Sequence, residues 1–342
     1  MGTIRDVARE AGVSASTVSR VVNGTAPISA ETAARVRAAI KRANYVPSRA
    51  ARTLRVQRST TLGLLISDIQ NPFFTALVRG VEDVAQSNGY SLILCNSDED
   101  LKKELQYVQI LCSEKVAGAI VVPASERSRS FLPFVEAGVP FIAVDRRLET
   151  NAIDCVLVDN VRGSFEAVAH LASRGNRRIA VVTGPLTTTT GRDRLEGYRT
   201  AIRNAGLPLD PDLERVGTFK SESGLRLTEE LLNLRPAIDA LFVANSAMGL
   251  GALEALRNRS VRIPDDVAVI IYDEMPWSSL PGVSLTTVRQ PTYELGRLSC
   301  LRLLDRMGAP AAVTRQEIVL VPELVVRDST RAFRGAPFFG GL

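Results

Sequence analysis

The sequence predicts an all-α helix-turn-helix head followed by an α/β body of two doubly wound parallel-sheet lobes. The first sixty residues carry three short amphipathic helix patterns separated by turns. From residue 60 onward, short apolar runs alternate with helical patterns, which is typical of parallel strands covered by helices on both faces. At 342 residues the chain is also too long for one typical hydrophobic core.

Capping residues mark the three helices of the head. Thr3 and Asp6 form a capping box for the first helix, and Gly12 ends it. Ser14 is the expected N-cap of the second helix, and the intervening turn contains glycine, as in helix-turn-helix motifs. Ser29 is expected to cap the third helix.

The second helix has a surface suited to the major groove of DNA. Val18 and Val21 are expected to be buried, which leaves an outward face of small and polar side chains. Small residues let a helix approach base edges, hydroxyls donate to phosphates, and arginine pairs with guanine. An ordinary surface of a small helical bundle has the same composition. The residues expected to face outward are Ala15, Ser16, Ser19, Arg20 and Asn23.

Positive charge is concentrated at the N-terminus. Residues 1–58 contain eleven basic and three acidic side chains, and eleven minus three is +8, whereas the whole chain carries +5. The remainder therefore carries −3. A cationic module on a near-neutral body is typical of proteins that bind polyanions. A basic face in contact with solvent alone gives the same count.

The segment "PSRAARTLRVQRST", residues 47–60, combines arginines with one projecting leucine. A helix this short is marginal in water, so we expect it to become helical on DNA, where phosphates neutralise Arg49, Arg52 and Arg55. In a symmetric dimer, Leu54 can wedge between base steps in the minor groove. The alternative is a basic interdomain linker with no DNA contact of its own.

The body contains eight apolar runs that predict strands of two successive lobes. Polar or turn residues follow these runs, and ligands bind outside the carboxyl ends of strands in open parallel sheets. Two facing sets of strand ends predict a ligand cleft, although any one of these residues also suits a turn or a helix cap. The runs cover residues 61–67, 90–96, 117–123, 140–145, 153–159, 177–184, 238–245 and 266–273.

Several sequence motifs follow one another along the chain: "TIRDVAREAGVSASTVSRVVNG", "YVPS", "AARTLR", "DIQNPFF", "VDRR", "AHLASRGNRRIAVVTG", "RLEGYRTAI", "YDE" and "SLTTVRQP". Through these motifs the chain resembles the lactose/galactose-repressor (LacI/GalR) family of bacterial transcription regulators. The motifs cover almost the whole chain. The resemblance implies a periplasmic-binding-protein-like body that senses an effector. It also implies base contacts by Ala15, Ser16 and Arg20, phosphate contacts by Thr3, Ser14, Thr17, Ser19 and Asn23, and a minor-groove wedge at Leu54.

The resemblance also implies an effector site. Its expected residues are Asn71, Phe73, Phe74, Asp145, Arg194, Phe219, Asn245, Asp273 and Trp277. A plain packing role suits Trp277 equally well. The chain has Ser246 where the resemblance implies an aspartate in many relatives, so that either one carboxylate acceptor for a sugar is missing or the aspartate is only a structural cap. Arg192, beside Arg194, is compatible with an anionic ligand but is more typical of a surface position.

Nothing in the sequence predicts catalysis. The single histidine, His170, lies in a helical pattern without a recognisable nucleophile motif, and phosphate-loop and dinucleotide-binding motifs are missing. We therefore expect no enzyme activity, no cofactor and no metal. Four scattered cysteines and the lack of a signal-peptide core indicate a cytoplasmic, nucleoid-associated protein with no membrane partner.

These features together predict a homodimeric, ligand-responsive repressor of a near-palindromic DNA operator, with a sugar or related metabolite as effector. The alternative is a solute-binding protein or small-molecule enzyme with a basic N-terminal arm. The expected divisions are a head at 1–46, a hinge at 47–59 and a body at 60–342. Within the body, the N-lobe comprises about 60–159 plus 290–321, and the C-lobe about 160–289 plus 322–342.

Overall fold

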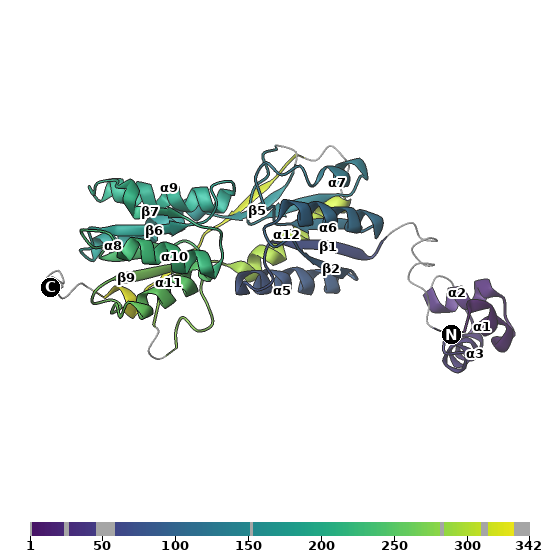
Figure 1. Cartoon of the computed structure of the whole chain (residues 1–342). Helices are drawn as coiled ribbons and strands as arrows, with labels where there is room; N and C mark the ends of the chain where they lie inside the picture. The colour runs from purple at the N-terminus through teal and green to yellow at the C-terminus, as the bar shows by residue number, and fades with distance from the viewer. Residues whose placement is uncertain are drawn as a thin grey trace. The chain divides into compact units, whose positions relative to one another are not determined.

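The computed structural model describes residues 2–23, 27–45, 59–150, 153–280, 284–308 and 314–331 (Figure 1). The chain forms two compact units, residues 1–60 and 61–342, each of which is described by itself. The predicted hinge residues lie outside the described ranges. They are Arg49, Arg52, Leu54 and Arg55.

The N-terminal unit contains the three predicted helices: α1 (Ile4–Ala11), α2 (Ala15–Asn23) and α3 (Ala30–Arg42). The capping box of α1 is present, because the Thr3 hydroxyl accepts from the Asp6 backbone N–H and the Asp6 carboxylate accepts from the Thr3 N–H at 2.9 Å. Gly12 follows with φ of 63°, which glycine adopts readily. Ser29 caps α3 by accepting from the Thr32 N–H. The predicted helices and caps are therefore confirmed.

The expected outward position of Ser19 is wrong. Ser19 is 9% exposed, and Ala15, one helical turn earlier, is half-buried against the core of the head. The reason is the helical period: residues at i and i+4 share a face, so Ser19 follows Ala15 onto the flank of the Val18 stripe. Ser16 and Arg20 are exposed as expected.

The N-lobe of the body is built on a fully parallel six-stranded sheet in the order β11-β5-β4-β3-β1-β2. Its strands are β1 (Thr61–Ile66), β2 (Ser91–Asn96), β3 (Gly118–Val121), β4 (Phe141–Val144), β5 (Cys155–Val158) and β11 (Glu317–Leu320). Alternation along β1 sends Leu62, Leu64 and Ile66 to one face and Leu65 to the other.

The C-lobe contains a second six-stranded sheet, in the order β12-β10-β9-β8-β6-β7. All its neighbours are parallel except β12, which runs antiparallel to β10. Its strands are β6 (Ile179–Thr183), β7 (Glu214–Val216), β8 (Ala240–Val243), β9 (Ala268–Tyr272), β10 (Thr286–Arg289) and β12 (Glu323–Val325). The eight predicted strands and the fold class are confirmed. The sequence interpretation did not predict β7, β10, β11 and β12 as strands. β7 and β10 contain no run of consecutive apolar residues, and β11 and β12 lie in a late segment that was expected only to cross between the lobes.

Helices cover both faces of each sheet (Figure 1). One face of the N-lobe sheet packs on α5 (Pro72–Ser87) and α12 (Thr292–Gly308), and the other on α6 (Leu101–Ser113) and α7 (Leu132–Glu136). In the C-lobe, α8 (Asn160–Ser173) and α9 (Thr189–Asn204) lie on one face, with α10 (Ser221–Leu232) and α11 (Ser246–Asn258) on the other. Two 3₁₀ turns span Pro211–Leu213 and Asp328–Thr330. Within the described ranges, every helix is too short or too polar to cross a membrane.

Late segments of the chain complete the N-lobe. Helix α12 lies directly against α5, because a Cβ at Gly80 would come 2.1 Å from the Tyr293 carbonyl oxygen and a Cβ at Gly296 would come 2.1 Å from that of Leu77. A glycine on each helix therefore permits the close approach. Strand β11 then adds to the sheet beside β5.

A buried ion cluster fixes α12 to the sheet. The carboxylate of Asp154 is fully buried and accepts from Arg302 Nε at 3.0 Å, from Arg306 Nη2 at 2.6 Å and from the Gln316 backbone N–H at 2.8 Å. Burial opposes ionisation of Asp154, but these hydrogen bonds outweigh it and lower the pKa. The carboxylate of Asp154, immediately before β5, thus joins α12 to Gln316, the residue before β11.

Candidate functional site

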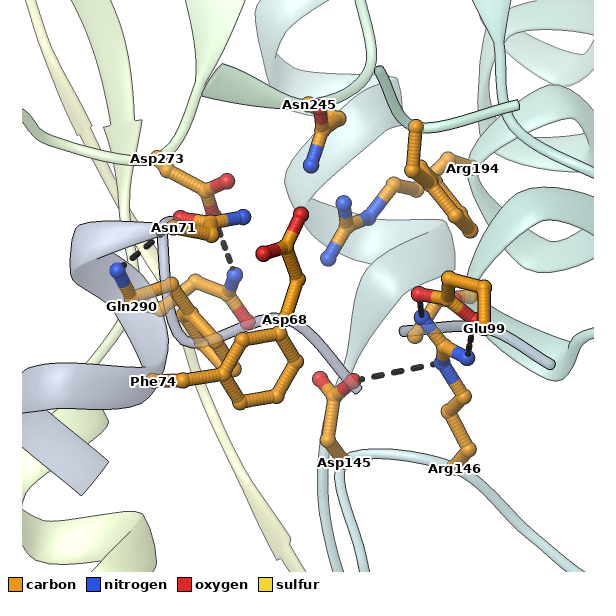
Figure 2. A pocket seen from close by; sticks show the side chains of 13 residues that line it. Asp68, Asn71, Phe74, Glu99, Asp145, Arg146, Arg194, Asn245, Asp273 and Gln290 are labelled. Carbon is orange, nitrogen blue, oxygen red and sulfur yellow. Dashed lines mark hydrogen bonds and ion pairs between the residues drawn. The ribbon is translucent and has the colours of Figure 1, made fainter. Parts of the chain in front are cut away.

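A cavity lies between the two lobes of the body (Figure 2). Its lining is mainly polar, with three phenyl rings among the lining residues. The cavity is lined by Asp68, Asn71, Phe73, Phe74, Glu99, Asp145, Arg146, Thr190, Arg194, Phe219, Asn245, Asp273 and Gln290.

The sheets position most of the polar lining residues. Asp145 comes immediately after β4 and Asp273 immediately after β9. Asp68 and Asn245 come two residues after β1 and β8, and Gln290 immediately follows β10. Because parallel strands end at the same edge of a sheet, these residues converge from distant parts of the sequence.

Arg194 is held rigidly on the C-lobe side. Its Nε donates to Asn160 Oδ1 and its Nη1 to the Ala244 carbonyl oxygen, both at 2.7 Å. The guanidinium also lies 3.8 Å from the ring centroid of Tyr272, within cation–π range. The side chain is therefore oriented before any ligand arrives, and its outer edge points into the cavity (Figure 2).

Asp145 and Arg146 occupy the N-lobe side. Arg146 makes a bidentate pair with Glu99, at 2.6 and 2.7 Å, and its Nε lies 3.6 Å from Asp145 Oδ2. Burial raises the pKa of Asp145 to about 6, although Arg146 and Arg194 oppose the shift. Asp145 Oδ1 is buried without a hydrogen-bond partner in the described part of the chain, so it is an acceptor directed at the cavity.

Asp273 anchors a hydrogen-bonded group that spans the lobes. Its Oδ2 accepts from the Ser246 N–H at 3.2 Å, and its Oδ1 accepts from Gln290 Nε2. The Ser246 hydroxyl donates to Asn71 Oδ1 at 3.2 Å, across the cleft. Asn71 and Asn245 also cap α5 and α11 by accepting from the N–H groups of the first turn. Ser246 therefore joins the two lobes.

Aromatic rings supply an apolar wall. Phe73 and Phe74 meet edge to face with centroids 5.0 Å apart, and both are buried. Phe219 approaches from the C-lobe with its ring 5.2 Å from the Arg146 guanidinium carbon. The wall suits the C–H face of a small ring, while the carboxylates and amides suit its hydroxyls.

Left-handed backbone conformations gather at this cavity. Among the described non-glycine residues with positive φ are Asp98 (56°), Glu99 (61°), Asp145 (66°), Phe219 (61°) and Asp273 (81°). Such conformations are unfavourable for residues with a Cβ and are found mainly where a site requires them. Local backbone strain therefore contributes to the orientation of the cavity side chains.

The structure brings together eight of the nine predicted effector residues. Trp277 is the exception: it is half-buried, packs on the C-lobe core and lies outside the cavity lining. Arg192 pairs with Glu126 instead of facing the cavity, so it provides no anion site there. The lining residues missing from the predicted effector set are Asp68, Glu99, Arg146, Thr190 and Gln290. Asp68 follows the first predicted strand, where cleft residues were expected, and Arg146 and Gln290 lie within the "VDRR" and "SLTTVRQP" motifs.

The head presents its predicted DNA-facing residues at the start of α2. Ser14 Oγ lies 2.7 Å from Ser16 Oγ and 2.9 Å from Thr17 Oγ1, so three hydroxyls form one cluster. Ser14, Ser16 and Arg20 are exposed, as is Thr3 at the start of α1. Hydroxyls at a helix N-terminus with a nearby arginine can bind phosphate and base edges.

Comparisons with known proteins cover both units. Residues 3–48 match the family model described as bacterial regulatory proteins, lacI family, and residues 168–330 match the periplasmic binding protein-like domain. A ribose operon repressor from Halalkalibacterium halodurans is 38% identical over 338 residues, which cover 97% of this chain and 98% of the relative.

Two solved structures are similar over most of the chain. The Lac repressor dimer bound to operator and the anti-inducer ONPF has a TM-score of 0.84 and 30% identity, covering 96% of this chain and 99% of that one. A LacI family regulator from Enterococcus faecium with bound ribose has a TM-score of 0.71 and 30% identity, covering 80% and 100%.

Asp145→Asn is expected to stabilise the body at neutral pH. Because the folded-state pKa is raised, the native protein holds a proton that the unfolded chain loses between about pH 4 and 6, so wild-type stability falls as pH rises through this window. Asparagine does not ionise, and it tolerates positive φ. The stability gain should grow from pH 5 to 7.5, to about 2 kcal/mol.

Urea unfolding followed by circular dichroism measures this difference. The exposed Asp305→Asn variant is the control and should follow the wild type at every pH. A constant offset between Asp145→Asn and the wild type from pH 5 to 7.5 would contradict the assignment.

Proposed function

The chain belongs to the LacI family of bacterial regulatory proteins, and from this premise we propose that it represses genes of sugar use with D-ribose as its effector. It is a ligand-responsive transcription regulator that binds operator DNA as a dimer. The cavity between the lobes supports a sugar as the effector, because it combines buried carboxylates, a fixed guanidinium and phenyl rings.

The charge of the cavity favours a neutral ligand. Four carboxylates line it, those of Asp68, Glu99, Asp145 and Asp273, against two guanidinium groups. A phosphate or carboxylate on the ligand would meet this negative excess in a low-dielectric space. Hydroxyl groups instead donate to Asp145 Oδ1 and to Gln290 Oε1, both buried and without a partner in the described residues.

Two relatives support ribose among neutral sugars. One is named a ribose operon repressor and is 38% identical along almost its whole length. The other is a family member whose structure contains ribose. The phenyl rings of the cavity lining can also cover one apolar face of a sugar.

For DNA, the proposal assigns roles to the head and the hinge. Ala15, Ser16 and Arg20 read base edges, and Thr3, Ser14, Thr17 and Asn23 bind phosphates. Ser19 is left out of the phosphate contacts because it is largely buried. In the hinge, Leu54 wedges into the minor groove, flanked by phosphate contacts from Arg49, Arg52 and Arg55.

The proposed mechanism couples the two units. Effector binding changes the angle between the lobes. This change moves the N-lobes of the dimer and thereby alters the folding of the hinge. Effector and operator binding are then linked reciprocally, commonly by about 1–3 kcal/mol. The proposed divisions are 1–46, 47–59 and 60–342. The protein works on the nucleoid in the cytoplasm, where its DNA partner is, and has no catalytic step.

Selection from random DNA duplexes tests the proposal. At a stated salt concentration, the full chain should enrich a near-palindrome with a flexible central step, and D-ribose should release it. Deletion of residues 1–58 should abolish enrichment and preserve ribose binding. Failure of the full chain to enrich any sequence, with and without ribose, would refute the regulator and favour a solute-binding protein.

Leu54→Ala is expected to weaken operator binding at least tenfold while leaving non-specific DNA binding within about twofold. A wedge acts only where the duplex is kinked, whereas non-specific binding depends on phosphate contacts. Fluorescence anisotropy with operator and scrambled duplexes measures both affinities. Equal losses on the two duplexes would remove the wedge role from Leu54.

Arg194→Ala is expected to abolish the ribose response and preserve operator binding. The variant loses a fixed donor inside the cavity, at a cost of more than tenfold in ribose affinity. Calorimetry with D-ribose and anisotropy with operator measure the two activities, and intact operator binding shows that the variant is folded. A normal ribose response would show that Arg194 does not contact the effector.

A further inference from the structure

A short arm of the C-lobe reaches across the effector cavity. It comprises residues 217–220, between β7 and α10. The Gly217 N–H donates to the Thr183 carbonyl oxygen at 2.7 Å, and the Thr218 N–H donates to Ser223 Oγ at 3.1 Å. These bonds fix the base of the arm to the C-lobe. Contacts that Phe219 and Lys220, at the tip of the arm, make with the N-lobe therefore connect the two lobes.

The tip of the arm makes two such contacts. Phe219 has a φ of 61°, and its ring lies on Gly184, where a Cβ would come within 2.0 Å of it. Across the cleft, that ring meets the Arg146 guanidinium at 5.2 Å. The next residue, Lys220, donates through Nζ to Asp68 Oδ2 and to Asp98 Oδ1, both at 2.7 Å.

The side chain of Lys220 does not stabilise the start of its own helix, α10. Lys220 occupies the N-cap position of α10, and its side chain makes no capping hydrogen bond. A cation at a helix N-terminus opposes the helix dipole, and lysine is not among the preferred N-cap residues. The two carboxylates of the N-lobe compensate this cost. Burial disfavours the charge of Lys220, but the hydrogen bonds to Asp68 and Asp98 outweigh it and raise its pKa.

The two carboxylates differ in their relation to the cavity. Asp68 lines the cavity, whereas Asp98 is exposed and lies outside the lining, as does Lys220 itself. Lys220 can therefore influence an effector only through Asp68 and through closure of the lobes. Loss of Asp98 would weaken the bridge without removing any group that faces the ligand.

We propose that Lys220 is a positioning residue that holds the two lobes closed over the effector, with Asp68 and Asp98 as its anchors on the N-lobe. The inference rests on the proposed function, in which this cavity binds the effector. The bridge stabilises the closed arrangement and orients the Asp68 carboxylate toward the ligand. Opening the cleft separates one ammonium group from two carboxylates.

The chain offers a matched control. Lys103 Nζ lies 3.6 Å from Asp98 Oδ2, so it pairs with the same carboxylate. Lys103 belongs to α6 of the N-lobe, however, and its ion pair does not cross the cleft. Lys220→Gln and Lys103→Gln each remove one positive charge beside Asp98, and only the first removes a bridge between lobes.

Closure is measured first without ligand, on the full chain. Nitroxide labels are placed at Glu114→Cys of the N-lobe and Glu254→Cys of the C-lobe, both exposed, with Cys112→Ser to prevent labelling there. Labelled chains are diluted with unlabelled ones, so that pulsed electron resonance reports distances within one chain. Lys220→Gln and Asp98→Asn should each shift the distance distribution from the wild-type value. Lys103→Gln should not.

Calorimetry with D-ribose then tests the link to the effector. Lys220→Gln should bind about fivefold more weakly than the wild type, and its affinity should depend less on added NaCl, since screening weakens the bridge only where it exists. Adding Asp98→Asn to Lys220→Gln should cause little further loss. Lys103→Gln should match the wild type.

The outcomes separate the two proposals. Unchanged distances in Lys220→Gln, or equal shifts in Lys220→Gln and Lys103→Gln, overturn the bridge. Unchanged ribose affinity in Lys220→Gln overturns its role in effector binding. If the wild type does not bind D-ribose, the proposed effector is wrong, and the ligand-free distances still decide whether Lys220 holds the lobes together.

Discussion

Parallel strand pairing is the constraint on which the rest of the body depends. In a parallel sheet every strand ends at the same edge, so the residues that follow the strands gather there whatever their separation in sequence. Asp68, Asp145, Asn245, Asp273 and Gln290 reach one cavity from five different strands in this way. The core residues within the strands contribute stability, and the loops after them carry the polar chemistry.

The cavity combines groups that are individually unfavourable. Buried carboxylates lie close together, several residues adopt left-handed backbone conformations, and acceptors such as Asp145 Oδ1 lack partners among the residues that the structure describes. These costs are offset elsewhere in the body. The fully buried Asp154 binds two arginines, and paired glycines allow α5 and α12 to pack closely. A ligand rich in hydroxyl groups would satisfy what the protein leaves unpaired.

The strands and cavity residues that the sequence could predict are those marked by an apolar run or by a family motif. Continuous apolar runs revealed eight strands, whereas β7 and β10 lack such runs and were missed. β11 and β12 were also missed, although they contain short apolar runs, because they return late in the chain to the edges of the two sheets. Family resemblance located Arg194 and Asp145, whose motifs are clear. Glu99 could not be found this way, because it reaches the cavity through an unusual backbone angle and a pair with Arg146.

Ser19 and Trp277 show a second limit. Serine and tryptophan both occur on protein surfaces and in protein interiors, and a single sequence does not show whether a given one is buried. Ser19 lies beside the Val18 stripe because of helix geometry, and Trp277 packs on the C-lobe core instead of the cavity. Strand ends and helix caps are local properties and could be predicted, while the burial of a single side chain depends on the complete tertiary structure.

The position of α12 and β11 has a consequence for synthesis of the protein. Strands β1 to β5 and helix α5 leave the ribosome early, but α12, the second helix on the face of Leu62, Leu64 and Ile66, follows more than two hundred residues after β1. Until then, a nascent chain exposes part of an apolar sheet face to chaperones and proteases. A product of premature termination would therefore carry the head on an N-lobe that lacks α12 and β11.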